Sequence, residues 1–523
     1  MMMIRLLHRH RIVLALTIAF LAVACIISSH TEGTSVSLNA TQHISSPMKA
    51  HLLDGSIAVF DHGGDIANRQ ISGTGMRYDP TLKTAVAVTA PIPLDSVVGV
   101  ETFERVVNPG RTLLYSTLAT AGTIIGATAA AVAIFGSCPT IYVDSAGTQV
   151  LQAESFSYSI APLLAKRDVD RLQVASEGSG VVRLTVRNEA LETHYLDQIE
   201  LLEASHAPDE LALPAARVGI IAVRHRVAGV TMHDRAGRNL ADVLGAADER
   251  VFATDSLTLD RASRGGPADD YIDVTIPSAP GRDSVAIVLR ARSSLLTTML
   301  LYDEMLAGQG AKALDYVGKD LQRVTKLAQL ADWYVKNLGL RVSVVTNDGR
   351  EQRQIVRLVD FGPAAWRDVA VVVPATADHD SVHVRLAFLA DAFRIDHLQV
   401  FGDLRELAPR SVPIARVLDR DGKLRPDARE VLLRTDDLQL QTWPGHEFKL
   451  EFDVGGDRTG IARTYFIAAQ GYYTEWMRGR WLATDSTTDF APWRKPVAPI
   501  LQRWLITRDS LEQTFFRQRV PIV

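Results

Sequence analysis

The chain has 523 residues, of which 47% are hydrophobic and 22% charged, and its formal net charge is −4. This composition is that of a folded protein rather than a disordered one, and the length predicts several domains. No basic excess points to nucleic acid as a partner. The two cysteines, Cys25 and Cys138, lie outside any spacing typical of a zinc site, so we expect no metal and no cofactor.

Residues 1–29 have the pattern of an export signal. A basic start, MMMIRLLHRHR, precedes a short apolar run, IVLALTIAFLAVA, at residues 12–24. The run fits a secretory signal better than a membrane span. It ends in LAVAC, which resembles a bacterial lipobox, the motif in which the cysteine becomes the lipidated first residue after cleavage. The pattern predicts lipidation of Cys25, and an ordinary signal peptide or an uncleaved anchor is the alternative.

Residues 30–110 predict a tether followed by a small β module. Residues 30–47 are rich in Ser and Thr, which is typical of a tether. In AHLLDGSIAVF, residues 50–60, an Asp-Gly pair separates two apolar runs, and this is a signal for a β-hairpin. Further short strands with tight turns follow. Together they favour a small SH3-like or Sm-like barrel.

Residues 111–137 contain a long apolar stretch with no charge between residues 112 and 136. About 20 apolar residues suffice to cross a bilayer, so the stretch is long enough for a transmembrane helix. Gly122, Gly126 and Ala130 recur at a spacing of four and would line one face of that helix, where another helix can approach closely. We therefore expect the membrane as a partner, and a protein partner or self-association through this face. A buried Ala/Gly-rich helix is the alternative.

The two apolar segments conflict in topology. An exported N-terminus followed by one span would return the remaining chain to the cytoplasm. Arg105 and Arg111 precede the stretch, whereas the first charges after it are Asp144 and Glu154, so the positive-inside bias would keep the body outside. We favour a membrane-associated protein of the cell envelope with a periplasmic or extracellular body.

Residues 138–292 predict a β-sandwich domain. Val182, Leu184 and Val186 alternate with polar residues, which is the period of two of a half-buried strand. Several short apolar runs follow, separated by Pro, Gly and Asp. Two stacked antiparallel sheets would bury strands of this kind.

Three further segments complete the chain. Residues 293–338 carry Leu and Met at spacings of three and four, with two glycines near the middle, and predict a helical hairpin inserted between sheets. Residues 339–405 continue the β pattern, and residues 406–523 predict a C-terminal segment rich in strands and aromatic residues. The expected fold class is therefore mainly β, of the α+β type.

The densest group of ionisable side chains consists of Glu189, Glu192, His194 and Asp197. Carboxylates paired with a histidine can carry out acid–base chemistry or bind a divalent cation. Alternate residues of a strand point to opposite faces, so we expect Glu192 and His194 on one face and Asp197 on the other. The alternative is a set of turn and strand-end residues held by backbone hydrogen bonds.

An aromatic surface formed by Tyr472, Tyr473 and Trp476 is a second candidate site. Aromatic platforms bind sugars or peptides, and they also anchor interfaces. The alternative is that these rings pack a terminal segment. The sequence contains no GxSxG elbow, Walker loop, dinucleotide fingerprint, HExxH or EF-hand motif, so we assign no catalytic residue.

Several short motifs resemble a module of extracytoplasmic bacterial proteins. They are CPTIY at 138–142, RLTVRNEALETHYLDQIELLEASH at 183–206, AWRDVAV at 365–371, DLQLQTWPGHEFKLEF at 437–452 and RTYFIAAQGYYTEWMR at 463–478. In other chains the module sometimes follows TPR or FG-GAP repeats, which are absent from this sequence. The resemblance implies a β-rich accessory or surface-exposed part with no assigned catalytic residue.

These observations favour a non-enzymatic, membrane-associated envelope protein with a binding or scaffolding role. Two alternatives stay open. One is a carbohydrate-active or other hydrolase whose site leaves no local motif, since distant residues can assemble an active site. The other is an accessory subunit of a membrane complex.

Overall fold

The computed structural model of the chain describes residues 29–107, 139–475 and 496–515, apart from short gaps. The gaps are residues 37–40, 46–47, 53–55, 61, 79–84, 146–147, 158, 161, 175–179, 191, 307, 310–315, 317–319, 322, 347–348, 360, 376–379, 437, 443–444 and 457–458. Cys25, Trp476 and the predicted helix face of Gly122, Gly126 and Ala130 therefore lie outside the described residues.

The N-terminal module, residues 29–107, contains two antiparallel sheets that share one core. The first sheet has the order β1 (Ser29–Ser35), β10 (Val97–Val107), β3 (Met48–Leu52), β4 (Ile57–Phe60), β7 (Met76–Tyr78), β8 (Ala85–Ala87). The second has the order β2 (Gln42–Ile44), β5 (Gly64–Ala67), β6 (Gln70–Ser72), β9 (Ile92–Pro93), and the 3-10 turn η1 (Leu94–Ser96) follows β9. The hairpin predicted at residues 50–60 is confirmed, because β3 and β4 pair antiparallel.

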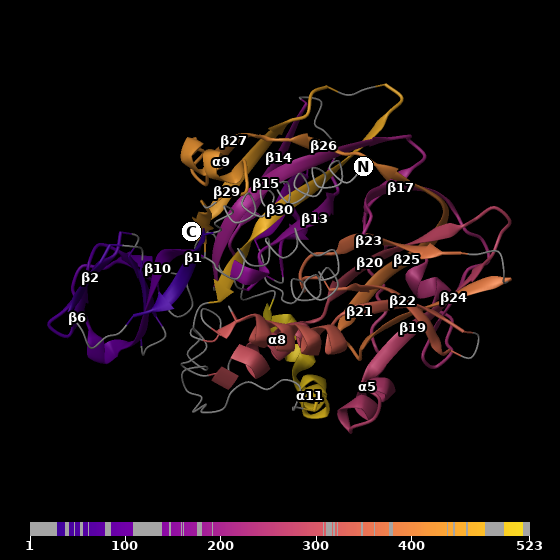
Figure 1. The fold of residues 1–523 in the computed structure, drawn as a ribbon, viewed down its shortest axis with the longest axis horizontal. Helices are drawn as coiled ribbons and strands as arrows, with labels where there is room; N and C mark the ends of the chain where they lie inside the picture. Colours follow the sequence, from indigo (N-terminus) through magenta and orange to yellow (C-terminus); the bar gives the residue numbers. More distant parts are fainter. Residues whose placement is uncertain are drawn as a thin grey trace, which may run out of the picture.

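The rest of the described chain forms a body of antiparallel sheets and one closed barrel (Figure 1). Sheet I has the order β12 (Thr148–Glu154), β11 (Thr140–Ser145), β14 (Val181–Arg187), β29 (Glu447–Asp453), β27 (Ile414–Asp419). Sheet II has the order β13 (Lys166–Leu172), β30 (Ala462–Glu475), β15 (Glu192–His206), β26 (Arg410–Val412), and β28 (Leu440–Thr442) also pairs with β15.

The barrel and a third sheet make up the other half of the body. The barrel has the order β16 (Leu211–Ala215), β17 (Gly219–Arg226), β25 (Phe393–Leu407), β20 (Ser284–Ser293), β23 (Arg367–Pro374), and it closes where Ala215 meets Ala370. Sheet III has the order β18 (Thr231–Asp234), β19 (Asp269–Pro277), β24 (Ser381–Leu389), β21 (Leu340–Val345), β22 (Glu351–Leu358). The fold is therefore mainly β, as the sequence predicts.

Sheet II is buried on both faces because it lies between sheet I and the barrel. On β15, Ile199 and Leu201 belong to the large core that includes sheet I. On the opposite face of the same strand, Leu202 packs with Ala212 and Ile220 of the barrel. The central strand of sheet I, β14, shows the predicted alternation, with Val182, Leu184 and Val186 in the large core and its arginines less buried. Burying both faces of a central sheet removes a large apolar area from water, which is the main favourable term in folding.

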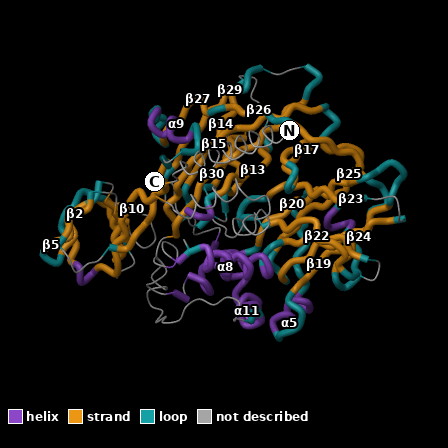
Figure 2. The backbone as a smooth tube through the Cα atoms, in the orientation of Figure 1, coloured by secondary structure: helices purple, strands orange, loops and turns teal. Residues whose placement is uncertain are grey.

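Short helices cover one side of the body, where Figure 2 shows α5, α8 and α11. The helical elements are η2 (Pro162–Leu164), α4 (Ala241–Leu244), α5 (Ser256–Ser263), α6 (Leu295–Thr298), the π-helix η3 (Met299–Leu306), α8 (Val324–Asn337), α9 (Pro426–Leu432) and α11 (Ala498–Phe515). At the start of the 293–338 segment, where the sequence offers Ser293 or Ser294 as a cap, the side chain of Ser294 caps α6 by accepting from the Leu296 N–H. None of the helices in the described ranges is long and apolar enough to cross a membrane, and residues 111–137 lie outside those ranges.

The sheets are not divided along the predicted segment boundaries. Strands from residues 140–206 pair with strands from residues 410–475 to make sheets I and II. The intervening part of the chain, residues 211–407, forms the barrel and sheet III. Local periodicity carries no information about which distant strand completes a sheet. Residues 406–523 contain the strands β26 to β30, as expected, and also the helices α9 and α11, which were not predicted.

Candidate functional site

Two of the predicted acid–base residues come together on β15. Glu192 and His194 occupy alternate positions of the strand, and His194 Nε2 lies 3.2 Å from Glu192 Oε2. Their side chains are 1% and 0% exposed. The Asn188 side chain fixes the start of the strand, because its Nδ2 donates hydrogen bonds to the Glu192 and Thr442 carbonyl oxygens at 2.9 and 3.0 Å. The pair is therefore locked inside the body.

Pairing with β30 places further polar groups beside this pair. Glu475 is opposite Glu192, and Tyr473 is opposite His194 with its ring edge-on at a centroid distance of 6.4 Å. Burial lowers the pKa of His194 to about 3, and the charge of Glu475 opposes this shift. His194 is therefore neutral at pH 7. Its Nδ1 has no hydrogen-bond partner among the described residues, which suits the unprotonated nitrogen of a neutral ring.

A β-bulge explains the position of Asp197. The register between β15 and β30 shifts between Leu196 and Gln198, so Asp197 is the extra residue of the bulge. The shift brings Leu196 onto the same side as Ile199, and both enter the large core. A strand without the bulge would turn these two side chains to opposite faces. Asp197 therefore marks a local correction of the strand, and its side chain is 2% exposed.

Glu189 has a separate environment from the other predicted cluster residues. Its Oε2 accepts hydrogen bonds from Thr140 Oγ1 at 2.8 Å and from Tyr142 OH at 2.6 Å, both on β11. The glutamate thus joins the loop after β14 to the neighbouring strand of sheet I. Among the described residues, no group of three or more His, Cys, Asp or Glu side chains is placed to hold a metal ion.

The predicted aromatic surface is not found at Tyr472 and Tyr473, which are both 0% exposed. Tyr472 stacks on Tyr195 with ring centroids 4.5 Å apart and an interplanar angle of 12°. The correction has a physical reason. Both faces of sheet II are covered, so neighbouring residues of β30 are buried whichever side they point to. The third member, Trp476, lies outside the described residues.

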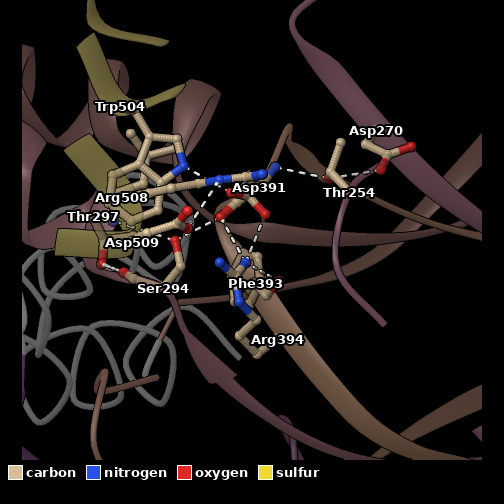
Figure 3. Close-up of polar contacts among 11 residues, drawn as sticks. Thr254, Asp270, Ser294, Thr297, Asp391, Phe393, Arg394, Trp504, Arg508 and Asp509 are labelled. Carbon is tan, nitrogen blue, oxygen red and sulfur yellow. Dashed lines mark hydrogen bonds and ion pairs between the residues drawn. The ribbon is translucent and has the colours of Figure 1, made fainter. Parts of the chain in front are cut away.

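A buried carboxylate that was not predicted from the sequence, Asp391, organises a second group of polar contacts (Figure 3). It lies in the turn between β24 and β25 with a φ of 65°, a left-handed conformation that Asp tolerates better than most residues. Its backbone N–H donates to Thr254 Oγ1 at 2.8 Å, and its carbonyl accepts from Ser294 Oγ at 2.6 Å. Thr254 in turn donates to Asp270 Oδ2 at 2.7 Å. The turn is thereby tied to β19 and to the start of α6.

The carboxylate of Asp391 connects this turn to the C-terminal helix. Its Oδ1 accepts from Arg394 Nη1 at 2.7 Å. Its Oδ2 accepts from Trp504 Nε1 at 2.7 Å and from Arg508 Nη1 at 3.3 Å, both on α11. Asp391 and Trp504 are each 0% exposed. We call Asp391, Arg394, Trp504 and Arg508 the Asp391 cluster. A turn-forming Asp is visible in the sequence, but nothing local indicates its distant partners.

Charged side chains also join sheet II to the barrel. Arg367 of β23 contacts Asp168 of β13, with 2.6 Å between Nη2 and Oδ1. Asp368 accepts from Arg171 Nη1 and from Arg290 Nη1, each at 3.2 Å. The Arg367–Asp168 and Arg171–Asp368 contacts link the two layers at largely buried positions. These contacts use ordinary opposite-charge pairing and leave the residues little freedom to bind another molecule.

Comparisons with known proteins give no family. No model of a protein family matches the chain, and no curated protein matches it. A solved structure described as "Structure of infectious bursal disease virus Gx strain" aligns over 94% of this chain and 91% of that chain, at 9% identity and a TM-score of 0.11. A score this low carries no argument about fold or function.

Proposed function

We propose that the chain is a non-enzymatic protein of the bacterial cell envelope, attached to the membrane, whose β body binds or scaffolds other molecules. One observation carries the choice of binding over catalysis. Glu192 and His194, the acid–base candidates, are 1% and 0% exposed. A general acid or base must reach its substrate and titrate near the working pH, whereas burial lowers the pKa of His194 to about 3. The pair suits packing between sheets rather than proton transfer.

The proposed attachment rests on two segments of the sequence. LAVAC at residues 21–25 has the lipobox pattern, and lipidation of Cys25 would anchor the mature N-terminus. A second apolar signal strengthens such an attachment. Residues 111–137 supply that second signal, as a membrane helix or as a segment packed on lipid or protein. The body would then lie on the periplasmic or extracellular side.

The finer architecture belongs to the same proposal. We infer that the N-terminal module is a small SH3-like or Sm-like barrel, supported by two short-stranded sheets around one core. We infer a β-sandwich for sheets I and II, supported by the core residues that both sheets contribute. The resemblance to a repeat-associated extracytoplasmic module also favours an accessory, surface-exposed role.

Fatty-acid labelling with cell fractionation tests the proposed attachment. The full chain is expressed in a bacterial host that processes lipoproteins, together with Cys25→Ala and the matched control Cys138→Ala. We expect the wild type and Cys138→Ala to carry the fatty-acid label and to fractionate with the membrane. Cys25→Ala should lose the label. Recovery of the intact wild-type chain in the soluble cytosol with its first methionine retained would overturn the proposal.

A second candidate function is that of an accessory subunit of a membrane complex, and it rests on the small-residue face of residues 111–137. Gly122, Gly126 and Ala130 would let a partner helix approach closely. Gly126→Leu should disrupt that association, whereas Thr128→Leu, two residues along and off this face, should not. Crosslinking in detergent followed by size analysis distinguishes them. Equal association of both variants would remove the support for this reading.

A further inference from the structure

The outer face of sheet III carries a row of side chains that is not fully paired. Ile272, Val342 and Leu386 point to the core, so the alternate positions of β19, β21 and β24 face outward. The register places Tyr271 opposite Ala387, Ala387 opposite Arg341, and Arg341 opposite Arg357. The small side chain of Ala387 thus separates a tyrosine from two adjacent arginines.

The two arginines of this row, Arg341 and Arg357, differ in their partners, and neither has a two-pronged contact with a carboxylate. Like charges directly opposite each other on adjacent strands destabilise a sheet. Arg341 forms two single-atom ion pairs, with 3.8 Å from Nη2 to Asp269 Oδ2 and 3.4 Å from Nε to Glu351 Oε2. Arg357 is half-buried, and within the described ranges no atom hydrogen-bonds to its buried Nε. Burial and the charge of Arg341 lower the pKa of Arg357, and the charges of Asp269 and Glu351 oppose this shift.

Local packing holds the stem of Arg357 in place, while its Nε has no acceptor among the described residues. A Cβ added at Gly339 would come within 2.6 Å of Arg357 Cγ and Cδ, so glycine at this position lets the arginine stem lie against the backbone. Ser343, two positions from Arg341 on the same side of β21, is 2% exposed, and its Oγ has no hydrogen-bond partner among the described residues. The site thus holds unused donors at fixed positions.

A neighbouring arginine on the same face provides an internal contrast. Arg385 donates to both carboxylate oxygens of Asp273, at 2.7 and 2.8 Å. It also stacks on the Tyr271 ring, with 3.9 Å from its guanidinium carbon to the ring centroid. Asp269 and Glu351 are 53% and 44% exposed and have no such bidentate contact. The face therefore supplies a forked carboxylate partner for Arg385 and none for Arg341 and Arg357.

We propose that Arg341 and Arg357 form an anion-binding site on the outer face of sheet III. The ligand class is an oxyanion, namely the carboxylate, sulfate or phosphate group of a larger molecule. The planar guanidinium presents paired N–H donors that match two oxygens of such a group. A bound oxyanion would neutralise the opposed charges and would displace the single-atom ion pairs to Asp269 and Glu351, whose side chains are 53% and 44% exposed and free to turn toward solvent. The inference adds a ligand class to the proposed binding role, and it is tested on purified protein, so it can fail independently of where the chain is found in the cell.

Calorimetric titration of the full chain in detergent tests the site. The probes are sodium sulfate, sodium phosphate and sodium acetate, each compared with sodium chloride at matched ionic strength, because salts screen all surface charges. We expect saturable binding by the wild type. Arg357→Gln and Arg357→Lys should bind at least about tenfold more weakly, since both remove the forked contact and the lysine keeps the charge. Arg353→Gln, an exposed position on the same strand, is the matched control and should bind as the wild type does.

The three probes distinguish a carboxylate ligand from a sulfated or phosphorylated one. Stronger binding of acetate assigns a carboxylate ligand, and stronger binding of sulfate or phosphate assigns a sulfated or phosphorylated one. Absence of saturable binding above the chloride baseline would overturn the proposal. Equal binding by the wild type and Arg357→Gln would overturn it as well, because the anions would then act on the protein without this site.

Discussion

The Asp391 cluster and the Arg341–Arg357 pair differ in how completely their charged groups are hydrogen-bonded within the protein. Asp391 is fully buried, and both of its carboxylate oxygens accept hydrogen bonds from cationic or polar side chains. Arg357 is half-buried, and its Nε has no acceptor among the described residues. A buried charge is tolerated when its partners come from the protein itself. The comparison therefore assigns stability to the first group and ligand binding to the second.

Replacement of Asp391 should give the largest effect, because it removes the acceptor shared by three donors. We expect Asp391→Ala to destabilise the protein by about 3–5 kcal/mol, as found for the loss of one partner from a buried charge pair. Chemical denaturation of the full chain measures the change. Asp209→Ala is the control, since Asp209 is 61% exposed and pairs only with a surface arginine. It should cost less than about 1 kcal/mol. Similar losses of stability in both variants would contradict the stabilising role assigned to the buried contacts of Asp391.

Removal of a single donor from the same cluster should have a smaller effect. Trp504→Phe keeps an aromatic ring but deletes the N–H that donates to Asp391 at 2.7 Å. Hydrogen bonds to charged groups contribute about 1.5–3 kcal/mol, so we expect a loss in that range. The control is Ile506→Ala on the same helix. Ile506 is 79% exposed, so its replacement should change the free energy of unfolding by about 0.5 kcal/mol or less. Thermal and denaturant unfolding provide the values, and an unaffected Trp504→Phe would argue against docking of α11 through Asp391.

Because His194 is buried in the neutral form, we expect the free energy of unfolding to be about 2 kcal/mol lower at pH 5 than at neutral pH. Its pKa falls from 6.5 in the unfolded chain to about 3 in the folded protein, so the unfolded state binds more protons between these values. Stability from this group is complete above pH 6.5 and is lost as the pH falls toward 3. His194→Gln should flatten this part of the profile, and His62→Gln, at an exposed position of the N-terminal module, should not. Denaturation midpoints from pH 4 to 8 test this, and identical profiles for all three proteins would refute it.

The smallest effect on stability is expected at the proposed anion site. Arg357→Gln removes one of two opposed like charges, so in chloride buffer its free energy of unfolding should stay within about 0.5 kcal/mol of the wild type or rise slightly. The same denaturation experiment gives this value. A loss as large as that of Asp391→Ala would mean that Arg357 is structurally paired, and the contrast between the two regions would disappear.

Local features of the fold were predictable from the sequence. The hairpins β3–β4 and β11–β12 follow from turn residues between apolar runs, and both are present. The cap at Ser294 follows from its position before a helical pattern. Each of these depends on residues close together in the chain, where propensity and periodicity act directly.

Long-range features were not predictable in the same way. The bulge at Asp197 depends on the register with β30, more than 200 residues away in the chain. The burial of Tyr472 and Tyr473 depends on what covers each face of sheet II. For the candidate sites, alternation along β15 was enough to bring Glu192 and His194 to one face, but it could not indicate that the face is closed. The Asp391 cluster joins two segments that lie far apart in the chain, the turn before β25 and the helix α11, and no single stretch of sequence predicts it.

Protease accessibility of the body in living cells tests the membrane proposal most directly. Full-length protein is followed by antibodies to residues 138–523 in intact cells and in spheroplasts, and mass spectrometry determines its mature N-terminus. We expect a processed N-terminus and cleavage of the body by external protease once the outer barrier is removed, without lysis. Protection of the body until the cells are lysed, together with an unprocessed first methionine, would contradict the proposed location.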